Sequence, residues 1–374
     1  MKTAIVTGAT GFIGSRLALK LLKQGWIVHV LGRSKNSTSF ETRIFHAIDD
    51  ITGVPENRAL FKNLFCHDVD ICNPRLEMQN LIHSHHFDSE TLLFHVAGDT
   101  RFNPPSPEMQ HNINVSGPLN IIKAFHNHLS KVVHVSTAYV AGKRKGKILE
   151  GELDEGQEHR NNYEKSKLSA EVEVTKLCEQ LQLPLCITRP SIIINDSVTG
   201  RSPTLTHFNA LVYVVTRIQK HFKNDKNVNP SKEFRMPIDP TARPNLAPVN
   251  PIVDALIKVG TESTAPCKTY HLCHPHPQSN YEIVKLMAQA FGIQDFINLS
   301  FVYKFPEKFS YTEEMMLRSL KQYLPYLNEY CEFDVTNTRS IIPDYDSTFP
   351  VITPDYLDKV IYYQRHRQLR ESHH

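Results

Sequence analysis

Three side chains in the middle of the chain have the types and the spacing that carbonyl reduction requires. Thr137 ends the strand-like run of "KVVHVSTAYVAG", and Tyr163 and Lys167 follow 26 and 30 residues later in "NNYEKSKLSAEVEV". Residues four apart lie on one helix face, so the phenol and the ammonium are expected side by side. An adjacent cation favours the phenolate and lowers the pKa of tyrosine from about 10. Tyr163 could then act as general acid when hydride reaches a carbonyl carbon, and the Thr137 hydroxyl would stabilise the charge on its oxygen.

The beginning of the chain predicts the element that would hold a dinucleotide. "TAIVT" (Thr3–Thr7) reads as a buried strand, and glycines follow at Gly8, Gly11 and Gly14. A helical stretch then runs to Gly25, and "WIVHVL" supplies a second strand. Glycines at these positions permit a tight turn and close approach of backbone N–H groups to a pyrophosphate. A glycine-rich turn alone would be weak evidence, but strand, turn, helix and strand in this order indicate dinucleotide binding.

The end of the second strand predicts which dinucleotide binds. Enzymes that prefer NAD usually have an acidic residue there, which accepts a hydrogen bond from the ribose 2′-OH. This chain has "GRSKN", with Arg33, Ser34 and Lys35 and no carboxylate. A guanidinium and a hydroxyl suit a 2′-phosphate, whereas a solvated turn is the alternative. We expect NADP.

The motifs "TGATGFIG", "STAYV" and "YEKSK" resemble those of the extended short-chain dehydrogenase/reductases. The resemblance implies an α/β fold, a doubly wound parallel-sheet Rossmann fold with a smaller, mainly helical substrate-binding subdomain. We expect an NADP-binding domain over residues 1–200, a substrate-subdomain insertion over 201–245, and a return to the Rossmann core over 246–275. Residues 276–374 would form a C-terminal, mainly helical substrate subdomain.

The resemblance also assigns site residues. Aligning "STAYVAG" with the family's strand end gives Thr137 the catalytic role and Ser136 a supporting contact, and Asp68 and Val69 would border the adenine. The resemblance implies a catalytic set of Thr137, Tyr163, Lys167 and Asn114. The residues expected to contact the cofactor are Gly8, Thr10, Gly11, Phe12, Ile13, Gly14, Arg33, Ser34, Asp68, Val69, Ala97, Gly98, Ser136, Tyr163, Lys167, Pro190 and Ser191, with His95 beside them.

Within this superfamily the chain is most similar to the thioester reductase and fatty acyl-CoA reductase branch. Three features carry the similarity: the long connection between Arg33 and Asp68, the segment that joins Thr137 to Tyr163, and "NEYCEFDVTNTRSIIP" (Asn328–Pro343). That branch uses NADPH to reduce acyl thioesters, on coenzyme A or a carrier protein, to aldehydes or alcohols. The resemblance therefore implies the same reaction here.

Two other function classes remain open. The chain could be a sugar-nucleotide epimerase or dehydratase, or a ketone or aldehyde reductase of the same superfamily. It could also be a non-catalytic NADP-binding scaffold, although binding alone does not require Thr137, Tyr163 and Lys167 together. An epimerase would retain its cofactor through turnover, whereas a reductase would release the oxidised form.

The substrate side has fewer signals. Leu205, Phe208, Val212, Val215 and Phe222 form a helical stripe, which is more often core than a cleft for an acyl chain. Two basic stretches, Gly142–Lys147 and Lys220–Arg235, read as solvated loops or as sites for coenzyme A phosphates or an acidic carrier protein. The basic, amphipathic C-terminal helix could touch a membrane surface or pack on its own protein.

Composition limits the remaining possibilities. The formal net charge of +3 over 374 residues does not indicate nucleic-acid binding. Seven cysteines without a CxxC pair indicate reduced thiols, and no apolar run reaches the ~18 residues that span a bilayer. The first strand begins almost at Met1, so we expect no secretory leader and a cytoplasmic protein. "HLCHPHP" (His271–Pro277) reads as a loop, and we expect no metal.

Overall fold

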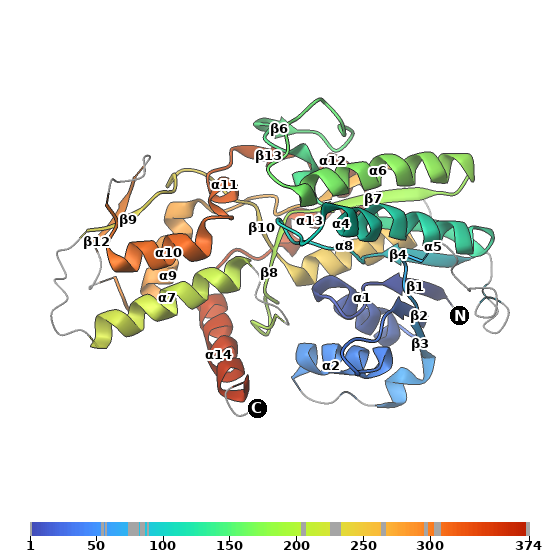
Figure 1. The fold of residues 1–374 in the computed structure, drawn as a ribbon, viewed down its shortest axis with the longest axis horizontal. Helices are drawn as coiled ribbons and strands as arrows, with labels where there is room; N and C mark the ends of the chain where they lie inside the picture. Colours follow the sequence, from blue (N-terminus) through green and yellow to red (C-terminus); the bar gives the residue numbers. More distant parts are fainter. Residues whose placement is uncertain are drawn as a thin grey trace. The chain divides into compact units, whose positions relative to one another are not determined.

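The computed structural model describes residues 2–53, 56, 58–73, 82, 87, 90–202, 207–224, 233–262, 267–294, 298–302 and 308–371. The chain forms two compact units, each built from several segments (Figure 1). The first unit comprises Met1–Ser191, Asn250–Cys273 and Phe333–Tyr345. The second unit comprises Ile192–Val249, His274–Glu332 and Asp346–His374.

A seven-stranded parallel sheet forms the centre of the first unit, in the order β11-β7-β5-β4-β1-β2-β3. Its strands are β1 (Thr3–Thr7), β2 (Ile27–Gly32), β3 (Leu64–Asp68), β4 (Thr91–His95), β5 (Leu129–Val135), β7 (Leu185–Pro190) and β11 (Thr269–Leu272). The chain order reverses between β1 and β4, which confirms the predicted doubly wound Rossmann fold. In such sheets ligands bind outside the carboxyl ends of the strands, at the point of reversal.

Helices cover both faces of this sheet, as the βαβ pattern requires (Figure 1). The helices of the first unit are α1 (Phe12–Lys23), α2 (Phe40–Thr52), α4 (Pro107–His111), α5 (Gly117–Phe125), α6 (Asn162–Gln180), α8 (Val249–Thr261) and α12 (Thr336–Ile341). Apolar residues of α5 and α6 pack on one face with strand residues such as Ile5, Leu93 and Val132. On α8, Gly260 lies against the ring of Phe94, where a Cβ atom would approach within 2.6 Å.

The segment Phe333–Tyr345 belongs to the first unit, whereas the sequence predicts it within the C-terminal subdomain. Hydrogen bonds explain the difference. The Thr338 hydroxyl lies 2.9 Å from the Glu150 carboxylate and 2.9 Å from the His271 carbonyl. Asn337 donates its side-chain amide to the carbonyl of Thr269 over 3.0 Å. These partners are distant in sequence, so no local pattern indicates them.

The second unit is mainly helical, as predicted. It contains α7 (His207–Asn224), α9 (Asn280–Ala290), α10 (Tyr311–Leu320), α11 (Leu324–Leu327) and α14 (Pro354–Glu371). Two short parallel pairs accompany them, β8 (Ile192–Ile194) with β10 (Leu246–Pro248) and β9 (Glu233–Met236) with β12 (Asn298–Phe301). Ser279 and Ser310 form capping boxes that begin α9 and α10. Among the described residues, no helix combines the length and the apolar character needed to cross a membrane.

Candidate active site

The fold brings Thr137, Tyr163 and Lys167 together at the carboxyl end of β5. Thr137 precedes a short 3-10 turn (η4, Ala138–Ala141), and its hydroxyl accepts a hydrogen bond from the Tyr139 amide over 3.3 Å. Tyr163 lies in the first turn of α6, which begins after the capping residue Asn161. The Thr137 hydroxyl is close enough to the Tyr163 phenol to lower the pKa of the phenol. The hydroxyl and the phenol can therefore both donate a hydrogen bond to one oxygen atom of a bound molecule.

The pKa of Tyr163 is shifted in the direction opposite to the one that the sequence predicts. Burial raises it to about 12, the Thr137 hydrogen bond lowers it, and the charge of Glu164 raises it again. The predicted depression by Lys167 is wrong for this structure, because the Lys167 ammonium is bound elsewhere. Its Nζ donates to the carbonyl of Val135 over 2.7 Å. Tyr163 is consequently a protonated hydrogen-bond donor throughout the neutral range.

The pKa of Lys167 is shifted in the opposite direction, below its usual value. Burial lowers its pKa from 10.5 to about 8, and the Glu171 carboxylate one helical turn further opposes this change. The side chain is buried, so the surrounding protein disfavours the ammonium form. A lysine with this pKa can release and recover a proton near neutral pH.

Asn114 lies in a π-helical turn, η2 (Asn112–Ser116), and is buried. Its amide nitrogen donates to the Asp99 carbonyl over 3.0 Å and to the Ser166 hydroxyl over 2.8 Å. Its oxygen accepts from the Asp99 amide over 2.7 Å. These bonds tie the loop after β4 to α6. Asn114 holds that framework beside α6, and its membership of the catalytic set stays a prediction.

Sequence reasoning missed the loop after Asp99. The Arg101 guanidinium binds both oxygens of Asp99 at 2.6 to 3.1 Å, and Gln110 donates to the Arg101 carbonyl over 2.7 Å. This loop holds the Phe102 ring 6.4 Å from the Tyr163 ring. Phe102 therefore forms an apolar neighbour of the phenol. The only local signal is the short "DTR" turn, in which the Arg101 amide donates to Asp99 over 3.0 Å.

The glycine-rich turn fits the pyrophosphate of a dinucleotide. Gly8 has a φ of 70°, and a Cβ atom there would lie 2.7 Å from the backbone nitrogen of Ala97. A Cβ atom at Gly14 would lie 2.3 Å from the carbonyl oxygen of Gly8. Side chains at these positions would clash with the backbone and displace the turn at the start of α1, where backbone N–H groups attract an anion. The buried Ser136 hydroxyl has no hydrogen-bond partner in the described part of the chain, which also suits a bound polar group.

At the end of β2 the Ser34 side chain has hydrogen-bond partners within the protein. The Ser34 hydroxyl and amide both donate to the Asp68 carboxylate, the amide over 2.9 Å, and the hydroxyl also accepts from the Phe40 amide over 3.0 Å. Ser34 thus organises the loop, and its contact with a phosphate stays a prediction. Asp68 ends β3 and lies beside Ser34 because β3 pairs with β2 in register. It places a carboxylate next to the end of β2, which has none of its own.

Two arginines lie at the same end of β2. Arg33 forms an ion pair with Asp70 over 3.1 Å and keeps 57% of its side chain exposed. Arg43, on α2, donates to the Arg33 carbonyl and lies 3.4 Å from the Thr10 hydroxyl of the glycine-rich turn. Sequence reasoning missed Arg43, since it lies ten residues beyond Arg33 on a different element.

The other predicted cofactor residues surround the same edge of the sheet. Gly11 caps α1, and Phe12 and Ile13 form its first turn. Val69 donates to the Gly32 carbonyl over 2.6 Å, and Gly98 lies against the Asn114 side chain. The Pro190 carbonyl lies 3.4 Å from the Thr137 hydroxyl, and Ser191 donates to Leu272 over 3.3 Å.

Two buried histidines lie in register on β4 and β5. The rings of His95 and His134 stack at 5.5 Å with 7° between their planes. The Thr7 hydroxyl accepts from the amides of Val96 and Ala97 at 3.1 Å each, so its own proton is directed to Nδ1 of His95, also at 3.1 Å. Burial lowers the pKa of His95 to about 3 and that of His134 well below its usual value. Both rings are therefore neutral.

The basic stretch Gly142–Lys147 is largely neutralised. Lys143 pairs with Glu158 over 2.8 Å, Arg144 with Glu152 over 2.6 Å and Lys147 with Asp334 over 3.5 Å. These pairs favour the loop interpretation over a phosphate site. In the second basic stretch, residues 225–232 lie outside the described residues.

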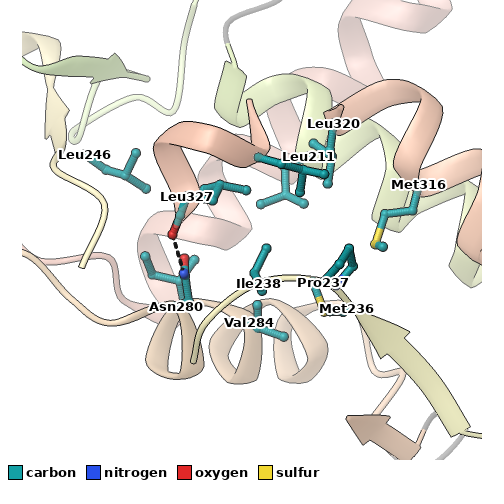
Figure 2. Close-up of a pocket in the computed structure, with 12 residues that line it drawn as sticks. Leu211, Met236, Pro237, Ile238, Leu246, Asn280, Val284, Met316, Leu320 and Leu327 are labelled. Atoms are coloured by element: carbon teal, nitrogen blue, oxygen red, sulfur yellow. Dashed lines mark hydrogen bonds between the residues drawn. The ribbon is translucent and has the colours of Figure 1, made fainter. Parts of the chain in front are cut away.

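The apolar stripe of α7 belongs to the core of the second unit. Phe208 and Val212 are buried there and Val215 packs against them, whereas Leu205 and the Phe222 side chain lie outside the description. Two apolar cavities of about 30 and 40 Å³ adjoin this core, and Figure 2 shows the first of them. Both cavities are lined by Leu211, Met236, Val284 and Met316. Their volumes compare with one or two water molecules, so neither holds an acyl chain in this conformation.

The chain is similar to known proteins in its sequence. Residues 6–253 match the NAD-binding family described as "Male sterility protein". A Ginkgo biloba protein named as an anthocyanidin reductase is 26% identical over 220 residues, which is 54% of this chain and 58% of that protein. Fatty acyl-CoA reductase 1 of Gallus gallus is 30% identical over 155 residues, which is 38% of this chain and 29% of the reductase. The chain thus spans little more than half, or less, of these relatives.

Solved structures share the fold. The terminal R domain of the myxalamid PKS-NRPS biosynthetic pathway has a TM-score of 0.77 at 21% identity, over 98% of this chain and 91% of that one. The dTDP-glucose 4,6-dehydratase of Bacillus anthracis, solved in complex with NAD, has a TM-score of 0.64 at 15% identity, over 98% and 97%. At these identities the similarity concerns the fold alone.

Proposed function

Because the chain belongs to the NAD-binding family described as male sterility protein, we propose that it is an NADPH-dependent reductase of acyl thioesters. The substrate would be an acyl group on coenzyme A or on a carrier protein, and the product an aldehyde or an alcohol. One observation carries the proposal: the hydroxyl of Thr137 and the phenol of Tyr163 lie close together at the carboxyl edge of the sheet, with Lys167 one helical turn further.

Two relatives support this substrate class. The chicken relative is named for the reduction of fatty acyl-CoA, and the myxalamid domain is a terminal R domain of a PKS-NRPS pathway. The first points to a coenzyme A thioester and the second to an acyl group on a carrier protein. We propose that the second unit is the substrate subdomain. The acyl group would be delivered on coenzyme A or, as the alternative, on an acyl carrier protein.

The proposed chemistry assigns a task to each side chain. A bound dinucleotide supplies a hydride to the carbonyl carbon. Thr137 and Tyr163 donate hydrogen bonds to the carbonyl oxygen and stabilise the negative charge that develops there. The raised pKa of Tyr163, about 12, keeps its proton in place for this purpose at neutral pH. When the carbonyl re-forms, the carbon–sulfur bond breaks and the thiolate leaves with the electron pair, so the product is an aldehyde.

The preference for NADP would come from Arg33 and Arg43. Their guanidinium groups lie at the end of β2, one of them largely exposed, and they can bind a 2′-phosphate through charge-assisted hydrogen bonds. Asp68 is engaged with Ser34, so it does not offer a free carboxylate to the ribose. The cradle at Gly8 and Gly14 would hold the pyrophosphate.

The test is NADPH consumption by the purified protein over a panel of acyl-CoA thioesters of increasing chain length. Tyr163→Phe is the matched control, because it removes only the hydroxyl. We expect consumption with at least one chain length and a loss of about 10²- to 10³-fold in the variant, the usual cost of removing one donor to an oxyanion. Equal consumption by both proteins would contradict the assignment of Tyr163.

A second function has an observation in its favour. The fold is also that of a dTDP-glucose 4,6-dehydratase, and the same Thr/Tyr/Lys arrangement suits a sugar nucleotide or a ketone. A dehydratase or epimerase regenerates its cofactor within each turnover. Tight retention of oxidised dinucleotide after purification, together with no net NADPH consumption, would favour that class.

A further inference from the structure

A buried ion pair joins α6 to the end of β7. The Nε atom of Arg189 lies 3.0 and 3.1 Å from the two carboxylate oxygens of Glu171, and Nη2 lies 2.7 Å from Oε2. Both side chains are at most 2% exposed. One guanidinium therefore occupies both oxygens of the carboxylate, as the planar fork of arginine allows.

Glu171 is four residues beyond Lys167 on the same helix, close enough for a direct ion pair. The Lys167 ammonium nevertheless donates to the Val135 carbonyl on β5. Glu171 is the charged group that favours the protonated form of Lys167 and keeps its pKa from falling below about 8. The other titratable groups that act on Lys167 from the sheet are His95 and His134, which are neutral.

Arg189 also holds the loop between Thr137 and Tyr163. Its Nη1 donates to the Glu152 carbonyl over 2.7 Å and lies 3.4 Å from the Glu150 carbonyl. From β11 the ring of His271 faces the guanidinium, and burial together with this cation lowers the pKa of the ring to about 3. Arg189 thus has one strong anionic partner, Glu171, and otherwise neutral ones.

We propose that Arg189 and Glu171 are positioning residues that set the charge state of Lys167. The guanidinium occupies the Glu171 carboxylate and thereby prevents that carboxylate from binding the ammonium. Lys167 stays attached to the Val135 carbonyl and remains able to exchange its proton near neutral pH. The relevance of this arrangement to catalysis rests on the proposed reductase function, whereas the titration of Lys167 does not.

The test is an NMR titration of the full chain labelled with ¹³C at the lysine Cε, with the Lys167→Met spectrum to assign the resonance. The variants are Arg189→Met, Glu171→Gln and the double variant. In Arg189→Met the buried carboxylate has lost its partner and turns to Lys167, so the midpoint should rise by about one pH unit or more, a tenfold gain in proton affinity. In Glu171→Gln and in the double variant the midpoint should fall.

A control ion pair separates this effect from general destabilisation. Arg235 and Glu313 form an ion pair in the second unit at 2.8 Å, in which Glu313 is buried and the Arg235 side chain is 28% exposed. Arg235→Met should leave the Lys167 midpoint unchanged. Equal midpoints in the wild type and in every folded variant would overturn the proposal, as would a downward shift in Arg189→Met.

Where Arg189→Met does not fold, Arg189→Lys keeps the cation but loses the fork. A smaller upward shift then supports the proposal, and no shift overturns it. The acyl-CoA assay on the same proteins keeps the two proposals apart. Shifted midpoints without turnover on any thioester would contradict the reductase function alone. Turnover with unshifted midpoints would contradict the positioning role alone.

Discussion

The side-chain amide of Asn114 donates a hydrogen bond to the Ser166 hydroxyl over 2.8 Å, and Ser166 in turn donates to the Tyr163 carbonyl over 2.9 Å. The π-helical turn is thereby connected to the first turn of α6. π-Helical turns occur frequently at functional sites because they direct a side chain that a regular helix could not. Here the directed side chain fixes the backbone from which the phenol of Tyr163 projects.

The first prediction concerns this connection. Asn114→Ala removes three hydrogen bonds and leaves the buried amide of Asp99 without its partner, whereas the Asp99 carbonyl keeps the hydrogen bond from Gln110 over 3.2 Å. We expect the free energy of unfolding to fall by roughly 2 to 4 kcal/mol, since each unsatisfied buried group costs about 1 to 3 kcal/mol. Urea denaturation monitored by circular dichroism measures the change. Asn112→Ala, at an exposed position of the same turn, is the control and should change stability by less than about 0.5 kcal/mol.

The second prediction tests whether Thr137 acts through its hydroxyl or through the shape of its side chain. Thr137→Ala removes one donor to the developing oxyanion, and kcat for thioester reduction should fall by about 10²- to 10³-fold. Thr137→Ser keeps the hydroxyl and should retain most of the rate. Steady-state kinetics on the acyl-CoA substrate identified in the panel provide the comparison. Equal rates in the alanine and serine variants would remove Thr137 from the mechanism.

The third prediction concerns the choice of dinucleotide. Arg33→Ala and Arg43→Ala should each raise the Kd for NADPH by about ten- to a hundredfold, the usual value of a hydrogen bond to a charged group, and leave the Kd for NADH nearly unchanged. Isothermal titration calorimetry with both dinucleotides measures the difference. Lys176→Ala, on the exposed side of α6, is the control for a general loss of charge. An equal loss of affinity for both dinucleotides would refute the 2′-phosphate assignment.

The fourth prediction concerns acid stability. His95 and His271 have pKa values of about 3, and the pKa of His134 is also far below its usual value, each mainly through burial. The unfolded chain binds these protons below a pH of about 6.5, whereas the folded chain does not. The free energy of unfolding should therefore decrease as the pH falls from about 6.5 towards 3.

His134→Phe tests the origin of that decrease. Neither ring nitrogen of His134 has a hydrogen-bond partner in the described part of the chain, so an apolar ring can replace it at little cost. The variant should lose less stability than the wild type between pH 7 and pH 4.5 in thermal unfolding experiments. Parallel curves for the two proteins would show that His134 does not contribute to acid lability.

Much of the fold follows from local patterns in the sequence. The buried run Thr3–Thr7, the glycines after it and the helix that follows specify a βαβ unit through contacts within about thirty residues. Tyr163 and Lys167 could be placed on one helix for the same reason. The helical character of the second unit also follows from local periodicity.

The remaining features depend on pairings between distant segments, which no local pattern contains. The bond of Ser34 to Asp68 requires that β3 lie beside β2 in register. The approach of Arg43 to Thr10 and of Phe102 to Tyr163 depends in the same way on tertiary packing. The expected direction of the Tyr163 pKa was wrong because burial and the engagement of Lys167 with Val135 cannot be inferred from a spacing of four residues.

The most direct test of thioester reduction by NADPH is a single-turnover reaction. It uses NADPH deuterated at both C4 positions and the best acyl thioester of the panel. Mass spectrometry then follows the acyl product and the released thiol. We expect one equivalent of free thiol and an aldehyde with one deuterium at its carbonyl carbon, or an alcohol with two if a second NADPH reacts. Free thiol without deuterium in the acyl product would indicate hydrolysis. That result, or an unchanged thioester in the presence of bound NADPH, would contradict reduction of the thioester.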